Sequence, residues 1–174
     1  MKQAVDVLQL FVLALPVLAP SAEAQSVPVT VDAVANSASY WRAGLNQVGI
    51  AQGSLFVVLG SNLGPSALAQ GQFPLSDQLG GSSVQIQVGS TIVPALLVYT
   101  VSRQIGAVLP SRTPVGTGTL NVTYDGHSSS SVPVTVAPAA VGIYTLNQGG
   151  TGPAAVTTAD YQVAHPLPQI RAKP

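Results

Sequence analysis

The chain of 174 residues has no cysteine, and only 7% of its residues are charged. The lack of cysteine excludes disulfides, thiolate metal sites and a cysteine nucleophile. A typical soluble domain has about 25% charged residues, and in this chain Ser, Thr, Gln, Asn, Gly and Pro take their place. The formal net charge is zero. Because phosphate neutralisation needs clustered Lys and Arg, we do not expect nucleic acid as a partner.

The first 24 residues have the pattern of a secretory signal peptide. Lys2 precedes an apolar segment at 7–18, and residues 22–24 (Ala-Glu-Ala) fit the small-x-small cleavage rule. Cleavage is expected between Ala24 and Gln25. The alternative is an uncleaved membrane anchor, but the segment is short for ~30 Å of hydrocarbon and Pro16 interrupts it. We therefore predict a secreted, periplasmic or cell-surface protein with no membrane attachment after cleavage.

An unbroken apolar run, Leu55–Leu59, lies between Gly53 and Gly60. It is too short for a typical helix, and its branched and aromatic residues favour a strand that is buried on both faces. Such a strand lies inside a sheet, with a neighbour on each side. The run therefore predicts the centre of the fold.

Shorter strands are predicted around this run. Apolar and polar residues alternate at 27–32, 84–88, 120–124 and 132–136, and further apolar segments lie at 92–99 and 105–109. Gly89-Ser90 and Asp125-Gly126 are typical of hairpin turns. Pro94 predicts a bulge or strand break, and Phe73 and Leu75 are expected to pack their long loop, 61–79, against the core. About seven short strands predict an all-β fold, a β-sandwich over residues 25–138.

Several motifs follow one another in a recognisable order: 36–40 (Asn-Ser-Ala-Ser-Tyr), 53–57 (Gly-Ser-Leu-Phe-Val), 60–65 (Gly-Ser-Asn-Leu-Gly-Pro), 104–105 with 109–110 (Gln-Ile, Leu-Pro), 130–136 and 137–145. The order resembles the uncharacterised Ig-like domain expanded in Solibacter and other Acidobacteria, which usually ends large secreted proteins and is similar to the IPT/TIG immunoglobulin-like fold. The resemblance covers about 31–156. It implies a secreted Ig-like module without established activity or catalytic residues. Gln52-Gly53 departs from the family's usual Pro-Gly.

The composition changes after residue 138. Family members normally continue into a second, similar half, and this chain enters that half around Ala154 and then stops. We therefore expect residues 139–174 to hold a Gly-rich linker at 149–153, the start of a truncated second repeat and a disordered Pro-rich tail. The chain would then be the remnant of a larger secreted or cell-surface protein.

Candidate catalytic and metal-binding groups are few. Asp125, His127 and the serines at 128–131 could suggest a catalytic triad, but residues adjacent on a hairpin point in different directions, and their composition is that of a polar turn. His165 lies in the Pro-rich tail. The aspartates lack calcium-loop spacing, and no phosphate-binding glycine motif leads into a helix. We expect no catalytic residues, no metal, no cofactor and no enzyme activity.

Two adjacent aromatic residues, Tyr40 and Trp41, form the one candidate binding site in the sequence. They could form an exposed aromatic platform for sugar rings, or Trp41 could cap one end of the core. Two functional hypotheses follow. The first is a non-catalytic exported structural or interaction module that binds other extracellular proteins. The second is an extracellular carbohydrate-binding module whose partners are glycans.

Overall fold

The computed structural model describes residues 27–40, 49–147, 150 and 152–157. These residues form twelve strands and no helix, which confirms the predicted all-β class. No helix in the described part is long and apolar enough to cross a membrane. The predicted signal peptide with its cleavage site at Ala24–Gln25 lies outside the described residues, as do Trp41, His165 and the Pro-rich tail.

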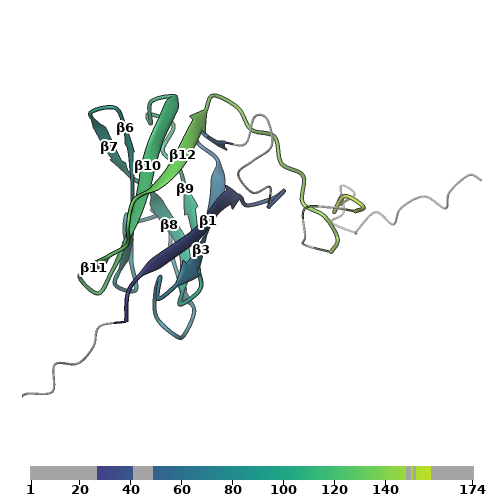
Figure 1. The fold of residues 1–174 in the computed structure, drawn as a ribbon. Coiled ribbons are helices and arrows are strands. Elements are labelled where there is room, and N and C mark those ends of the chain that lie inside the picture. Colours follow the sequence, from purple (N-terminus) through teal and green to yellow (C-terminus); the bar gives the residue numbers. More distant parts are fainter. Residues whose placement is uncertain (1–26, 41–48, 148–149, 151, 158–174) are drawn as a thin grey trace, which may run out of the picture.

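The strands form two sheets (Figure 1). The five-stranded sheet has the order β1 (Thr30–Asn36), β3 (Leu55–Ser61), β9 (Gln104–Val108), β8 (Leu96–Val101) and β4 (Ala69–Gln70). The seven-stranded sheet has the order β2 (Ile50–Ala51), β12 (Val132–Ala137), β10 (Gly116–Tyr124), β6 (Ser82–Val88) and β5 (Gln78–Leu79), with β7 (Thr91–Pro94) beside β6 and β11 (His127–Ser128) beside β10. Among the strand pairs of the described residues, only the short β2–β12 pair is parallel.

The core lies between the two sheets, as expected for a β-sandwich. The inward side chains of both sheets are removed from solvent, and each of the following is 0% exposed: Phe56, Val58, Leu97 and Ile105 from the five-stranded sheet, and Val84, Ile86, Leu120 and Val122 from the seven-stranded sheet. Alternation along each strand places these residues on one face. Burial of this apolar surface is the main force that holds the two sheets together.

β3 is an interior strand of its sheet, with β1 on one side and β9 on the other. Phe56 and Val58 point into the core, and Val57 on the opposite face is only 2% exposed. Leu55, at the start of the strand, is 42% exposed. The prediction of a strand buried on both faces is thus confirmed for residues 56–58, the middle of the predicted run Leu55–Leu59.

The predicted turns lie where Gly is needed. Gly89 between β6 and β7, and Asp125-Gly126 between β10 and β11, all have positive φ, which suits tight hairpin turns. β7 ends at Pro94, and the chain crosses to the other sheet and continues as β8 from Leu96. Pro94 therefore marks a strand break, as predicted, since Pro lacks the N–H that a continuing ladder requires.

Three expectations need correction. The described residues form twelve strands and not about seven, because the predicted segment 92–99 is divided into β7 and β8, and the two-residue strands β2, β4, β5 and β11 arise from pairing that the alternation pattern does not reveal. The first strand begins at Thr30 and extends to Asn36, so it starts and ends later than the predicted 27–32. Phe73 is 90% exposed and does not pack on the core. The backbone of this loop is held at both ends by β8, through Gly71 N to Val98 O at 2.7 Å and Leu97 N to Ser76 O at 2.8 Å. Phe73 lies between these two attachments, where the loop projects from the sandwich.

Candidate functional site

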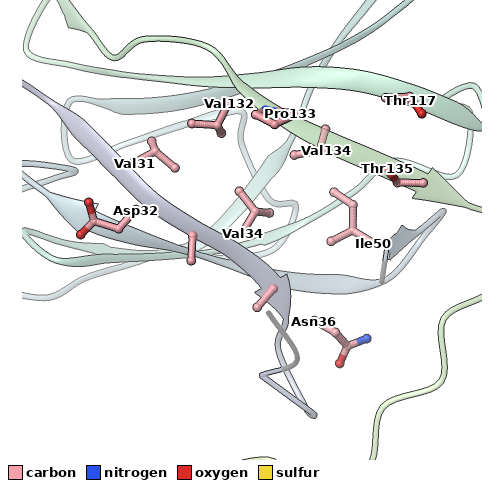
Figure 2. A pocket seen from close by; sticks show the side chains of 13 residues that line it. Val31, Asp32, Val34, Asn36, Ile50, Thr117, Val132, Pro133, Val134 and Thr135 are labelled. Atoms are coloured by element: carbon pink, nitrogen blue, oxygen red, sulfur yellow. The ribbon is translucent and has the colours of Figure 1, made fainter. Parts of the chain in front are cut away.

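An apolar groove separates β1, the edge strand of the five-stranded sheet, from β12, which β2 covers only at Val136 and Ala137. Its volume is about 370 Å³. Figure 2 shows the valines of the two strands facing one another across it, with Asp32 on the opposite side of β1. Its apolar lining consists mainly of Val31, Val34, Ile50, Val132 and Val134.

The β12 edge of this groove offers few backbone hydrogen bonds. The carbonyl of Ala137 accepts a hydrogen bond from Gln52 N at 3.1 Å, so it points away from β10. Backbone groups of alternate residues point to the same edge of a strand, which places the nitrogen of Pro133 on this free edge. Because Pro has no N–H, the edge lacks a donor where an added strand would need one.

The β1 edge is similarly limited. Ser37 N donates to Leu55 O at 3.3 Å, toward β3, and the carbonyl of Asn36 already accepts from Tyr40 N at 3.0 Å. Alternation leaves Val34 with both backbone groups on the free edge, and a bulge at Asp32 interrupts the register before it. Bulges, charges and prolines at sheet edges oppose the addition of further strands. The groove is therefore poorly suited to pairing with an extended peptide.

A second hollow lies on the outer face of the five-stranded sheet, and we call it the outer depression. Its volume is about 680 Å³. Ala33 and Leu59 are register partners on adjacent strands, and Leu59 is in turn opposite Gln104. Alternation places this row on the face that points away from the core. The full lining is Asp32, Ala33, Val34, Leu59, Gly60, Arg103 and Gln104.

The depression has an apolar floor and a polar rim. Ala33, Leu59 and Gly60 come from β1 and β3, whereas Asp32 comes from the bulge in β1 and Arg103 from the turn between β8 and β9. Asp32 and Arg103 are both exposed. Within the described part of the chain neither takes part in a salt bridge. Among the described residues, the two opposite charges are therefore both available to a ligand.

Tyr99 adjoins the depression through Gln104. The Gln104 amide donates a hydrogen bond from Nε2 to the Tyr99 hydroxyl at 2.8 Å. Tyr99 is opposite Gly106 in the register, and its half-buried ring lies against that glycine. A bulge between Leu97 and Tyr99 allows Leu97 to face the core while Tyr99 faces outward.

Two more tyrosines lie near Tyr99. Burial raises the pKa of Tyr99, the charges of Tyr40 and Tyr144 raise it further, and the hydrogen bond from Gln104 lowers it. Tyr40 follows the turn at 37–39, has a left-handed φ of 50° and is half-buried. Tyr144 is 54% exposed and shares a 3.1 Å hydrogen bond between its hydroxyl and Ser37 Oγ. We call Tyr40, Tyr99 and Tyr144 the tyrosine cluster.

The segment after β12 contributes Tyr144 to this cluster. In Figure 1 the chain leaves the sandwich after β12 and continues to one side of the two sheets. Asn36 Nδ2 donates to the carbonyl of Ala140 at 3.3 Å, and Gly142 lies against Asn36 and Ala38. These contacts hold residues 140–144 beside the turn that follows β1, so Tyr40 and Tyr144 reach the same region from distant parts of the sequence.

The structure describes only one of the two residues of the predicted aromatic platform. Tyr40 lies outside any strand, and Trp41 lies outside the described residues. His127 and Asp125 are exposed on a hairpin, and the described residues contain no cluster of His, Asp or Glu that could hold a metal ion. The sequence analysis did not single out Tyr99, Arg103, Gln104 or Leu59, because these residues are brought together only by strand register.

Comparison with known proteins adds no further assignment. Neither a protein-family model nor a curated protein matches the sequence.

Proposed function

We propose that this chain is a non-catalytic exported Ig-like interaction module, of the type that the motif order suggests for Solibacter and other Acidobacteria. Residues 1–24 would direct export, and Gln25 would begin the mature protein. The proposal is supported by the order of the sequence motifs, by the packing of two largely antiparallel sheets around one core and by the strand switch at Pro94. Ig-like sandwiches serve mainly as rigid supports for binding surfaces.

The outer depression is the observation that carries this proposal. In a chain with only 7% charged residues, an aspartate and an arginine line the same hollow without a salt bridge among the described residues. Neither charge contributes to the core, since both are exposed. Exposed polar groups that converge on one hollow favour recognition of a partner over a structural role.

The edge strands of the sandwich are poorly suited to pairing with a partner's strand, which favours binding at the outer depression. Pro133 on β12 and the bulge at Asp32 on β1 oppose strand addition at the groove. A partner would therefore contact side chains on the outer face of the five-stranded sheet. A module of this kind would bind other extracellular proteins or glycans without changing them.

Two measurements test the proposal. The N-terminus of the protein recovered from outside the cytoplasm should be Gln25. The mature chain should then be screened on arrays of extracellular polysaccharides and of secreted proteins, together with an Arg103→Ala/Gln104→Ala variant. The matched control is Gln85→Ala/Gln87→Ala, which alters two exposed glutamines on β6 of the other sheet.

We expect at least one purified ligand to bind the mature chain and the control equally. The same ligand should not bind the Arg103→Ala/Gln104→Ala variant, and it should be recovered chemically unchanged. If every ligand binds all three proteins alike, the outer depression is not an interaction site. If the bound ligand is cleaved or modified, the module is not a passive binder. Either result would overturn the proposal.

A further inference from the structure

We propose that the outer depression binds a neutral polysaccharide, with Asp32, Arg103 and Gln104 contacting sugar hydroxyls above an apolar floor. This inference rests on the proposed function, because it assigns a ligand class to the same surface. It places the site on residues of β1, β3 and the β8–β9 hairpin, and Tyr40 is not among the residues that line it.

The size and floor of the depression suit a sugar ring. Its volume of about 680 Å³ lies within the ~300–1,000 Å³ that is common for small-molecule sites. Leu59 is half-buried in the floor, with Ala33 as its neighbour on β1. The C–H face of a pyranose could rest on this apolar surface while its hydroxyls reach the rim.

The rim offers the hydrogen-bonding geometry that adjacent hydroxyls require. A carboxylate accepts at two oxygens, a guanidinium donates from several N–H groups in one plane, and an amide does both. Gln104 uses Nε2 to donate to Tyr99, which leaves its Oε1 able to accept from a ligand. The Tyr99 hydroxyl, having accepted that bond, retains its own hydrogen to donate. The Gln104–Tyr99 pair therefore holds one acceptor and one donor at neighbouring positions.

The charge balance favours a neutral ligand. Asp32 and Arg103 carry opposite charges, and they are the only charged residues that line the depression among those described. An anionic sugar would be attracted by Arg103 and repelled by Asp32, so ionic attraction brings little net gain. A hydroxyl can donate to one and accept from the other, and neutral sugars carry many hydroxyls. Peptide strands are disfavoured because both neighbouring edges resist pairing.

The test is calorimetric titration of the mature chain with neutral hexasaccharides built from β-1,4-glucose, β-1,3-glucose, β-1,4-mannose and β-1,4-xylose, and with hexagalacturonate as the charged comparison. Arg103→Ala and Asp32→Asn each remove one charged contact, and Tyr99→Phe keeps the ring but removes the hydroxyl. Asp77→Asn is the matched control, since Asp77 is exposed and does not line the depression. Unchanged thermal unfolding would show that each variant is folded.

We expect at least one neutral hexasaccharide to bind, and Arg103→Ala and Asp32→Asn to weaken that binding about tenfold or more, as for hydrogen bonds to charged groups. Tyr99→Phe should weaken binding about threefold to tenfold, and Asp77→Asn should leave it unchanged. The inference is overturned if hexagalacturonate binds more tightly than every neutral sugar, or if the variants bind like the mature chain. It also fails if no sugar binds while a protein ligand still requires Arg103, and in that case the proposed interaction module stands. If neither a sugar nor a protein ligand binds the mature chain, the proposed function is refuted as well.

Discussion

The ring of Tyr99 on β8 lies against Gly106 on β9, where a Cβ would collide with three carbons of the ring. The two residues are opposite each other in the register of the five-stranded sheet. The missing side chain at position 106 thus gives the tyrosine ring a place on the sheet, and from there its hydroxyl reaches Gln104. One residue without a side chain therefore positions the ring whose hydroxyl accepts a hydrogen bond from Gln104, a residue that lines the outer depression.

Gly106→Ala should destabilise the domain. The new methyl group would displace the Tyr99 ring or shift the backbone of β9, and overpacking of this kind typically costs about 1–3 kcal/mol. Urea unfolding of the mature chain would measure the change. In a double-mutant cycle with Tyr99→Ala, which removes the colliding ring, the loss caused by Gly106→Ala should become smaller. An equal loss with and without the ring would contradict the proposed collision.

The ionisation of Tyr99 should make stability fall at high pH. Burial and the charges of Tyr40 and Tyr144 raise its folded-state pKa above the ordinary value of 10.0, so the folded protein releases this proton at a higher pH than the unfolded chain does. The contribution of neutral Tyr99 to the free energy of unfolding is fully present below pH 10 and is lost as the pH rises through the raised folded-state pKa.

Tyr99→Phe, which cannot ionise, should show a shallower decrease in unfolding free energy above about pH 10. Chemical unfolding at several alkaline pH values would measure the two slopes, and the tyrosinate absorbance would report the titration directly. Identical slopes for the two proteins would rule out a raised pKa at Tyr99.

A buried hydroxyl pair links the two sheets. Ser82 on β6 and Thr100 on β8 are 1% and 0% exposed, and their hydroxyls are 3.0 Å apart. Ser82 Oγ also donates to the carbonyl of Leu63 at 2.8 Å. Because only one hydrogen is available on Ser82, Thr100 is the donor in the shared bond.

Ser82→Ala should therefore cost about 1–3 kcal/mol, since it leaves a buried hydroxyl and a buried carbonyl without this partner. The combined Ser82→Ala/Thr100→Val variant should cost less than the sum of the two single changes, because the second change removes one of the orphaned groups. Guanidinium unfolding of the four proteins would measure the coupling. Strict additivity would mean that the two hydroxyls do not interact.

Two phenylalanines should respond very differently to truncation. Phe56 is 0% exposed in the centre of the core, and Phe73 is 90% exposed on its loop. Phe56→Ala should cost about 3–5 kcal/mol through lost burial and a cavity, which is a large part of the ~5–15 kcal/mol that stabilises a typical domain. Phe73→Ala should change stability by no more than about 0.5 kcal/mol. Thermal unfolding of both variants would check the contrast, and a large effect at Phe73 would indicate that its loop packs on the core after all.

Local patterns accounted for much of the fold. Val84, Ile86, Leu120 and Val122 alternate with polar neighbours, and each one faces the core. Gly89 and Gly126 have the positive φ that their turns require. Phe73 shows where such patterns fail, because an aromatic residue in a loop does not reveal whether the loop reaches back to the core. That outcome depended on backbone bonds from the loop to β8.

The candidate site was far less accessible to prediction. Asp32, Leu59 and Gln104 are distant in sequence and meet only because β1, β3 and β9 are neighbours in one sheet. Bulges at Asp32 and before Tyr99 then decide which side chains face outward. A bulge shifts the alternation by one residue, and the alternation pattern alone does not show where it lies.

The all-β class, the interior strand β3 and the positions of the main turns follow from neighbouring residues and from a backbone period of two. The three-dimensional fold was needed to show which strands pair, that Pro133 and a bulge limit pairing at the open edges, and that opposite charges line one depression near Tyr99. Those relationships arise from contacts between distant segments, and no local period in the sequence encodes them.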